Sequence, residues 1–394
     1  MALRSARPGH RPRLLIITPD FPPAPGGIQV VAHRLAAGIK GFETSVIAPS
    51  SPGAARFDAE SGIHIRRVRG GARLRGGRNA LLNAAALGQA LRFRPDVTLS
   101  AHIVASPAAA AIGHLLGART IQYFHAEEIG AKPRLAAFAV RQAHESIAVS
   151  AYTAGLITAT GAVPERISVI PNGTDIPRDA TPVSADCPTF LTIARMEERY
   201  KGHDVMVRAL PLVLAKVPDA QWIVIGDGSL RAGLEHLARS YGVADSIRFL
   251  GAVSDEQRDL WLRRTDLLAM PSRLPARGFA GEGFGIVYLE AGAYGKPAVA
   301  GNVGGALDAV ADGESGLLVD PTDPLAVADA ITTLLLDHEL ASRLGRAGAE
   351  RARRFSWPII VERVEAVLLE ALESPPTGAG RRGRRVGGSA GTAA

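Results

Sequence analysis

The sequence has little cysteine and no long apolar run. Cys187 is the only cysteine among 394 residues, which excludes an internal disulfide and a cysteine-rich metal site. The most apolar segment, residues 101–118, contains a proline and two histidines and is shorter than the ~20 residues that a membrane span needs. No apolar run precedes Leu14, so we expect no secretory signal. These features favour a reduced, cytoplasmic protein.

Three motifs with defined chemistry are also missing. The sequence contains no H-E-x-x-H and no G-x-x-x-x-G-K-[ST], which argues against a zinc metalloprotease and a P-loop nucleotide-binding protein. It also lacks any D-x-D, the obvious carboxylate pair for a metal–diphosphate site. A diphosphate would have to be held by cations and backbone N–H groups.

The charge is unevenly distributed along the chain. The formal net charge is +7, but eight arginines lie in residues 1–13 and 379–394, where there is no acidic side chain. Residues 14–175 carry 16 basic and 10 acidic side chains, and residues 176–378 carry 21 and 28. Without its ends the chain is slightly acidic, which argues against a nucleic-acid partner. The first half contains a basic cluster, made of Arg66, Arg67, Arg69, Arg73, Arg75 and Arg78.

Short apolar runs alternate with helical patterns in two series, which predicts two α/β domains with parallel sheets. A polar segment with three prolines, residues 175–188, separates the series. We predict a Rossmann-like domain over 13–175 and a second over 186–357, followed by a helix over 358–373. The ends, 1–12 and 374–394, are expected to be flexible. Ligands of such sheets bind at the carboxyl ends of the strands, so we expect the site in an inter-domain cleft.

The first domain offers two candidate features. Gly26 and Gly27 follow the first strand and begin a helix, where free N–H groups suit an anion. An ordinary turn is the alternative. His125 ends the fifth predicted strand and could either act on a substrate or satisfy a carbonyl group.

Cations and glycines follow the first strands of the second domain. Arg195 and Lys201 could neutralise a diphosphate and stabilise charge on a leaving group. Solvated surface charge is the alternative. Gly226 follows the next strand, but the third glycine of the dinucleotide fingerprint is absent because position 231 is arginine. This departure weakens a dinucleotide oxidoreductase, which we keep as a distant alternative.

The most informative motif runs from Gly281 to Ala291. Two of its glycines, Gly283 and Gly285, precede an apolar helix whose first N–H groups could face an anion. Two glutamates flank this turn, Glu282 before the helix and Glu290 within it. Ionised carboxylates accept several hydrogen bonds from sugar hydroxyls. A helix cap and a salt bridge are the alternative roles.

Together these motifs resemble glycosyltransferase family 4, whose members have the GT-B architecture of two facing Rossmann-like domains. The resemblance covers residues 13–373 and includes Gly304-Gly305. It implies that the helix over 358–373 crosses back to the first domain, and that the active site holds no cofactor and no metal. Within the family the chain looks most like the actinobacterial mannosyltransferases that act on phosphatidylinositol mannosides. Residues 199–204 are instead similar to transferases of exopolysaccharide assembly. Asp308 departs from the family, where many members have glutamate, and we expect small consequences.

The resemblance implies roles for the candidate residues. Glu282 would hold the hydroxyls of the donor sugar and Glu290 the ribose. The diphosphate would lie on Arg195 and Lys201, with backbone help from Phe284 and Gly285. His125 would lie beside the donor sugar. The base would lie near backbone groups around Val253.

The resemblance also implies the reaction. We expect a retaining, metal-independent glycosyltransferase that moves a hexose, with mannose from GDP-mannose as first choice. A UDP-sugar-dependent transferase of exopolysaccharide or small-molecule glycoside synthesis is the alternative. The acceptor would be a lipid-linked sugar or a glycan. The basic cluster would dock the protein on the inner face of the membrane, since each Lys or Arg near an anionic surface contributes ~1 kcal/mol; a solvated basic loop is the alternative.

Overall fold

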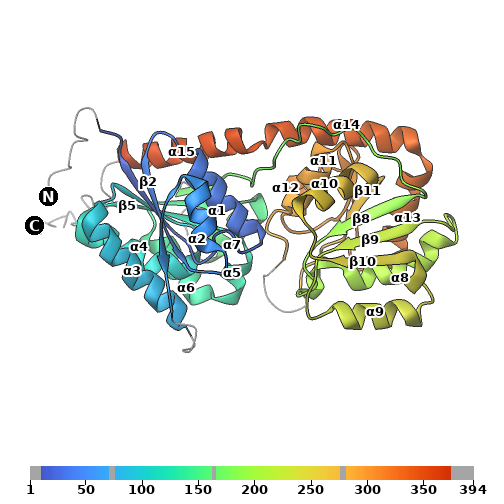
Figure 1. Cartoon of the computed structure of the whole chain (residues 1–394), viewed down its shortest axis with the longest axis horizontal. Coiled ribbons are helices and arrows are strands. Elements are labelled where there is room, and N and C mark those ends of the chain that lie inside the picture. Colours follow the sequence, from blue (N-terminus) through green and yellow to red (C-terminus); the bar gives the residue numbers. More distant parts are fainter. Residues whose placement is uncertain (1–9, 71–75, 162–165, 276–280, 374–394) are drawn as a thin grey trace, which may run out of the picture.

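The computed structural model describes residues 10–70, 76–161, 166–275 and 281–373, which form two α/β domains (Figure 1). The predicted ends 1–9 and 374–394 lie outside the described residues. The first domain contains a seven-stranded parallel sheet in the order β3-β2-β1-β4-β5-β6-β7. Its strands are β1 (Arg13–Ile17), β2 (Glu43–Pro49), β3 (His64–Val68), β4 (Val97–Ser100), β5 (Arg119–Phe124), β6 (Glu145–Ala148) and β7 (Ile167–Val169).

The second domain repeats this arrangement with six strands. Its parallel sheet has the order β10-β9-β8-β11-β12-β13, so in both sheets the chain moves outward, returns to the centre and moves outward on the other side. The strands are β8 (Thr189–Ile193), β9 (Gln221–Ile225), β10 (Ile247–Gly251), β11 (Leu267–Met270), β12 (Ala298–Gly301) and β13 (Gly316–Val319). The predicted fold class, two domains with parallel sheets, is confirmed.

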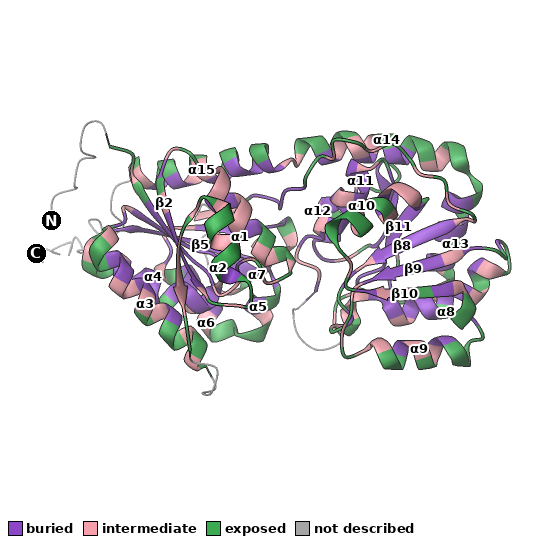
Figure 2. Cartoon of the chain, in the orientation of Figure 1, coloured by how far each residue is buried: buried purple, intermediate pink, exposed green. Residues whose placement is uncertain are grey.

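Helices cover both sheets. Figure 2 shows buried strands beneath helices whose outer faces are exposed. In the first domain these are α1 (Gly27–Gly38), α2 (Ala54–Ser61), α3 (Gly77–Phe93), α4 (Ser106–Leu116), α5 (Glu127–Ala131), α6 (Pro133–Gln142) and α7 (Ala151–Ala159). In the second they are α8 (His203–Leu214), α9 (Arg231–Ser240), α10 (Asp255–Arg264), α11 (Ile286–Ala293), α12 (Ala306–Ala309), α13 (Pro324–Leu336) and α14 (His338–Arg354). Within the described ranges, no helix is long and apolar enough to span a bilayer.

Two helix starts follow directly from the sequence. The Ser254 side chain accepts a hydrogen bond from the Gln257 N–H, and the Gln257 side chain accepts one from the Ser254 N–H, which completes the predicted capping box of α10. Asp323 caps α13, whose first residue is the predicted Pro324. By contrast, β7 was not predicted. It has only three residues and lies at the edge of the sheet, so its apolar signal is weak.

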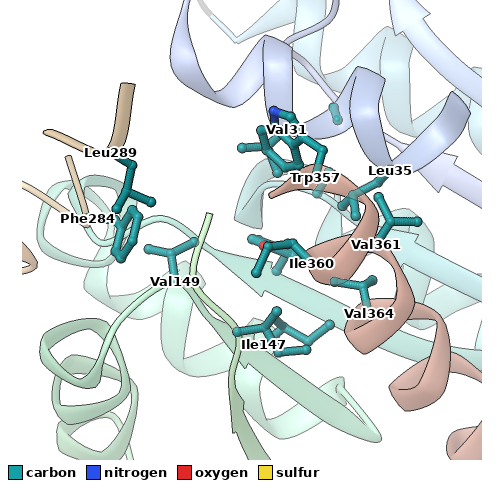
Figure 3. Close-up of a cluster of buried hydrophobic side chains, with 14 of the residues drawn as sticks. Val31, Leu35, Ile147, Val149, Phe284, Leu289, Trp357, Ile360, Val361 and Val364 are labelled. Atoms are coloured by element: carbon teal, nitrogen blue, oxygen red, sulfur yellow. The ribbon is translucent and has the colours of Figure 1, made fainter. Parts of the chain in front are cut away.

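The last helix, α15 (Trp357–Glu373), joins the two domains. It follows α14 and packs on α1 of the first domain (Figure 1). The Trp357 N–H donates to the Thr174 carbonyl at 3.2 Å, and Glu365 accepts from the Gly41 N–H. Figure 3 shows Val361 and Trp357 of this helix beside Val31 and Leu35 of α1, in a buried apolar cluster.

The same cluster continues across the domain interface. Phe284 and Leu289 of the second domain are 1% and 2% exposed, and Figure 3 places them beside Val149, which follows β6. Burial of this apolar surface stabilises the observed arrangement of the two domains. The loop that contains Phe284 is therefore anchored by packing as well as by its glycines.

Candidate active site

The carboxyl edges of the two sheets face each other, and their loops make direct contact. A Cβ atom at Gly283, which follows β11, would lie 2.1 Å from the His125 carbonyl oxygen after β5. A Cβ at Gly27 would lie 3.8 Å from Ile286 of α11. Asp308, in α12, accepts a hydrogen bond from the Ala151 N–H at 3.2 Å, at the start of α7. The predicted site residues of both domains thus converge at one interface.

The glycine loop after β1 is shaped by its own polar contacts. Gly26 caps α1 with φ 147°, a conformation that favours glycine. The Gln29 amide donates to Asp20 Oδ1 at 3.2 Å beneath this turn. Burial raises the pKa of Asp20, although the charges of His125, Arg78 and Arg195 oppose that shift. Asp20 therefore lies in the electrostatic field of cations from both domains.

His125 is half-buried and satisfies a carbonyl group. Its Nε2 lies 3.0 Å from the Ala101 carbonyl oxygen, to which it donates in the neutral ring, and the ring stacks on Tyr123 with centroids 5.1 Å apart. Burial lowers the pKa of His125 to about 4, against the opposing effects of the Ala101 hydrogen bond and Asp20. The ring is therefore neutral at pH 7 and presents no positive charge to a ligand.

A buried glutamate fixes the turn after His125. Glu128 is 5% exposed and its Oε1 accepts from the His125 N–H at 2.7 Å. Its Oε2 is buried without a hydrogen-bond partner, and burial raises the pKa of Glu128 to about 7. Ala126, between them, has φ 87°, which is rare outside glycine. Glu128 thus positions the backbone that Gly283 contacts.

Lys201 and Glu282 form a close, nearly buried ion pair. Lys201 Nζ lies 2.6 Å from Glu282 Oε2, and the two side chains are 15% and 12% exposed. Burial disfavours the charge of Lys201, but Glu282 and Tyr200 outweigh it and raise the pKa of Lys201 above its usual value. Lys201 is therefore charged at physiological pH and is held against the loop that begins α11.

Arg195 differs from Lys201 in exposure. Its side chain is 64% exposed and contacts Glu198 at 3.1 Å, a surface pair of little energetic weight. Arg195 lies just beyond β8, and its charge reaches Asp20 and Glu127 of the first domain. Of the two predicted diphosphate cations, one is fixed and the other is free to reorient toward a ligand.

Two glycine loops of the second domain touch each other. A Cβ at Gly305 would lie 2.0 Å from the Gly283 carbonyl oxygen, and the Gly305 N–H donates to the Glu282 carbonyl at 2.8 Å. Gly285 caps α11 with φ 88°. Side chains at these positions would push the Glu282 loop away. The glycines therefore allow the backbones of the two loops to lie close together.

The remaining predicted residues lie at the neighbouring strand ends. Glu290, in α11, forms an ion pair with Arg258 of α10. Val253 lies in the loop between β10 and α10 and packs on the core. Gly226 directly follows β9, and a Cβ there would lie 2.1 Å from the Ala194 carbonyl oxygen. These residues line the same edge of the sheet as Lys201 and Arg195.

Sequence reasoning missed three residues of this region. Arg258 holds Glu290, Glu128 supports His125, and Asp308 was expected to matter little although it bridges the domains. Only Glu128 had a local signal, a carboxylate three residues beyond a strand-end histidine. The contacts of Arg258 and Asp308 join residues 32 and 157 positions apart, which no local pattern reveals.

One part of the predicted docking surface needs correction. Arg67 has a 9% exposed side chain, bonded to Asp58 at 2.7 Å, so it is a structural cation and not a surface one. Arg66 donates to Gln89 at 3.0 Å and is half-buried. Arg69 and Arg78 are exposed. Arg73 and Arg75 lie outside the described residues.

Comparison with known proteins fits this arrangement. The family model for glycosyltransferase family 4 matches residues 25–178, and that for glycosyl transferases group 1 matches residues 175–351. The chain is 31% identical over 363 residues to a Mycobacterium tuberculosis protein, over 86% of this chain and 93% of that one. That protein is the GDP-mannose-dependent alpha-(1-6)-phosphatidylinositol monomannoside mannosyltransferase. Its Mycolicibacterium smegmatis counterpart is 31% identical over 358 residues, covering 85% and 92% of the two chains.

Solved structures show the same fold. Anabaena HepE in complex with UDP and glucose superposes with a TM-score of 0.77 at 21% identity, over 92% of this chain and 100% of that one. Sucrose-phosphate synthase from Thermosynechococcus elongatus gives a TM-score of 0.78 at 20% identity, with the same coverage. These are GT-B structures, and the oxidoreductase alternative is set aside. The chain belongs to glycosyltransferase family 4 and is an enzyme that transfers a hexose.

Proposed function

We propose that the chain transfers mannose from GDP-mannose to a lipid-linked acceptor, with retention of anomeric configuration and without an active-site metal. The observation that carries this proposal is the 31% identity to the mycobacterial mannosyltransferase, which extends over 86% of the chain and so includes both faces of the site. The convergence of the predicted residues at the domain interface supports it.

Donor binding follows from the charges of the second domain. Lys201 and Arg195 would neutralise the diphosphate, and the start of α11 would add backbone N–H groups at Gly285. Lys201 contacts one carboxylate oxygen of Glu282, and Arg258 contacts one carboxylate oxygen of Glu290. Their remaining acceptor capacity would serve hydroxyls of the donor sugar and the ribose.

The chemistry would be substitution on one face of the sugar. The bond from the anomeric carbon to the diphosphate breaks, the bond to the acceptor oxygen forms on the same face, and the departing diphosphate oxygen takes the acceptor proton. Negative charge builds on the diphosphate, where Lys201 and Arg195 would stabilise it. Because His125 is neutral, it would not stabilise the charge of the diphosphate, and the cations of the second domain would do so.

A donor panel tests the proposal. Purified protein is incubated with phosphatidylinositol monomannoside and GDP-mannose, GDP-glucose, UDP-glucose or UDP-N-acetylglucosamine, each with and without EDTA. We expect one added hexose with GDP-mannose, unaffected by EDTA, and an α-anomeric product by NMR. Transfer only from a UDP-sugar would replace the proposal by its UDP-dependent alternative, and inversion or EDTA sensitivity would overturn the mechanism.

Membrane docking needs its own test because Arg67 is not part of the surface. Serine replaces four arginines of the basic cluster, the exposed Arg69 and Arg78 together with Arg73 and Arg75. The control replaces four exposed arginines of α14, Arg343, Arg346, Arg353 and Arg354. We expect the first variant alone to lose binding to anionic vesicles, by several fold or more at ~1 kcal/mol per charge. Equal binding by both variants would contradict docking through this cluster.

A further inference from the structure

A basic cavity lies on the first domain, away from the site described above. It has a volume of about 440 Å³ and lies among the ends of α4 and α6 and the start of β5. Its charged and titratable lining residues are Arg119, Arg141, Arg166, His114 and His144. Alanines, glycines, Thr120 and Gln142 complete the wall, and no described lining residue is acidic.

The cavity lies at the opposite edge of the sheet from the glycosyl-transfer site. Arg119 begins β5, whereas His125 follows its last residue, Phe124. A strand rises ~3.3 Å per residue, so the two ends are separated by roughly 17 Å. The cavity is therefore a separate place on the domain, and a donor bound between the domains would not occupy it.

Part of the positive charge around this cavity is stabilised by neighbouring protein groups. The carboxyl ends of α4 and α6 carry partial negative charge, and Arg166 Nε donates to the His144 carbonyl at 2.8 Å. Burial lowers the pKa of His144 to about 4, and Arg119, Arg166 and His114 act in the same direction, whereas the hydrogen bond from the Thr120 N–H opposes them. An anion would relieve this repulsion.

The donors are arranged to meet a ligand from several sides. Arg119 comes from β5, Arg141 from the last turn of α6, and Arg166 from the residue before β7. Arg119 is only 6% exposed, which weakens screening of its charge by water. Arg141 is exposed and forms no hydrogen bond or ion pair with any described residue, so it marks the open side. The Nδ1 atom of His144 accepts from the Thr120 N–H, which leaves Nε2 as the N–H donor of the neutral ring.

We propose that this cavity, which we call the arginine pocket, binds a phosphate-bearing ligand with one or two phosphoryl groups. Guanidinium groups match phosphate oxygens in pairs, and three of them around one volume favour phosphate over a single carboxylate. The volume is within the range of small-molecule sites. The phosphate belongs either to a soluble metabolite or to a lipid headgroup, and the chemistry of the pocket is the same for both.

Histidine NMR tests the proposal because two of the ten histidines line the pocket. Inorganic pyrophosphate is titrated into histidine-labelled Lys201→Ala protein, a background that weakens binding at the donor site. We expect the pKa of His144 to rise by about one unit or more, since a nearby anion favours the charged ring, and the His114 signals to shift on addition of pyrophosphate. Unchanged signals at millimolar pyrophosphate would overturn the proposal.

Matched variants locate the effect. Arg141→Gln and Arg166→Gln should each weaken pyrophosphate binding about tenfold, whereas Arg92→Gln, on the exposed last turn of α3, should not. Circular dichroism establishes that each variant is folded. Equal binding in all three variants would place the anion elsewhere and contradict the proposal.

Two further arms identify the source of the phosphate. Glycerol phosphate replaces pyrophosphate in the titration, and vesicles of phosphatidylcholine with phosphatidic acid are used for co-sedimentation. A histidine response to glycerol phosphate, with vesicle binding unaffected by Arg141→Gln, supports a soluble metabolite. Vesicle binding lost in Arg141→Gln and kept in Arg92→Gln supports a headgroup. Failure of both arms, with intact donor binding, overturns the pocket while leaving the proposed transferase activity standing.

Discussion

The two domains share a strand order but place opposite chemistry on their facing edges. The first domain has excess basic charge over residues 14–175, yet its edge presents Asp20, Glu128 and a neutral His125. The second has excess acidic charge over residues 176–378, yet its edge presents Arg195 and Lys201. Net domain charge therefore does not predict the charge of the site. The residues that directly follow each strand determine it.

The two domains would therefore contribute different chemical groups to the proposed reaction. Cations for the diphosphate come from the second domain, while the first domain contributes neutral or acidic groups on the acceptor side. Burial raises the pKa values of Asp20 and Glu127; across the interface Arg195 acts against this shift at both groups, whereas Glu198 of the second domain adds to it at Glu127. Four predictions break or sharpen this contrast.

Removal of the fixed cation should have the largest effect. Lys201→Ala removes the charge nearest to the expected leaving group and leaves Glu282 without its partner. We expect kcat to fall ~10²–10³-fold, the typical loss for one preorganised electrostatic contact. Steady-state transfer from GDP-mannose measures it. Lys216→Ala, which breaks an exposed pair with Asp329, is the control and should keep parental kcat; a similar loss in both would refute the assignment.

The second-largest effect is expected on stability, from substitution of Glu128, the buried carboxyl group of the first domain. The pKa of Glu128 is raised to about 7, so the folded state binds a proton that the unfolded state releases at lower pH. This stabilisation is present below about pH 4.5 and is lost as the pH rises through 7. Glu128→Gln should therefore match the parent at pH 4.5 and exceed it by on the order of 3 kcal/mol above pH 7.

Denaturant titrations across this pH range measure the difference. His125 titrates in both proteins, so its contribution cancels. Glu362→Gln, at an exposed position of α15, is the control and should change little. A stability difference for Glu128→Gln that does not grow with pH would show that the carboxyl is not held protonated.

A smaller effect is expected at Glu290. Glu290→Gln keeps the size of the side chain but removes the charge that we assign to the ribose and that Arg258 contacts. Hydrogen bonds to a charged group contribute ~1.5–3 kcal/mol, so GDP binding should weaken about 10- to 100-fold. Calorimetry with the exposed Glu362→Gln as control measures the change. Undiminished GDP affinity would remove Glu290 from the site.

The smallest effect concerns the bridge between the domains. Asp308→Ala removes the carboxylate that accepts from the Ala151 N–H at the start of α7. Loss of such a cap costs ~1 kcal/mol, which corresponds to a melting temperature lower by about 2–4 °C. Asp329→Ala, which breaks a surface pair within the second domain, should lower it less. If both variants melt alike, the bridge adds no stability.

The fold was largely predictable because its signals are local. Apolar runs, a capping box and a first-turn proline predicted strands and helix starts within a few residues, whereas β7, α2 and α14 were not predicted. The site was predictable where residues follow strand ends, as for Lys201 and Glu282. It was not predictable where the partner lies far along the chain, as for Arg258 with Glu290. Burial also escaped prediction: Arg67 belongs to a basic run in sequence but is buried against Asp58.

The central claim, that cations of the second domain hold a guanosine diphosphate, is tested most directly by calorimetric titration of GDP and UDP. The titration is performed on the parent, Lys201→Ala and Lys216→Ala. We predict tighter binding of GDP than of UDP to the parent, unchanged GDP binding by Lys216→Ala, and at least about tenfold weaker GDP binding by Lys201→Ala. Equal GDP affinity in all three proteins would contradict the account.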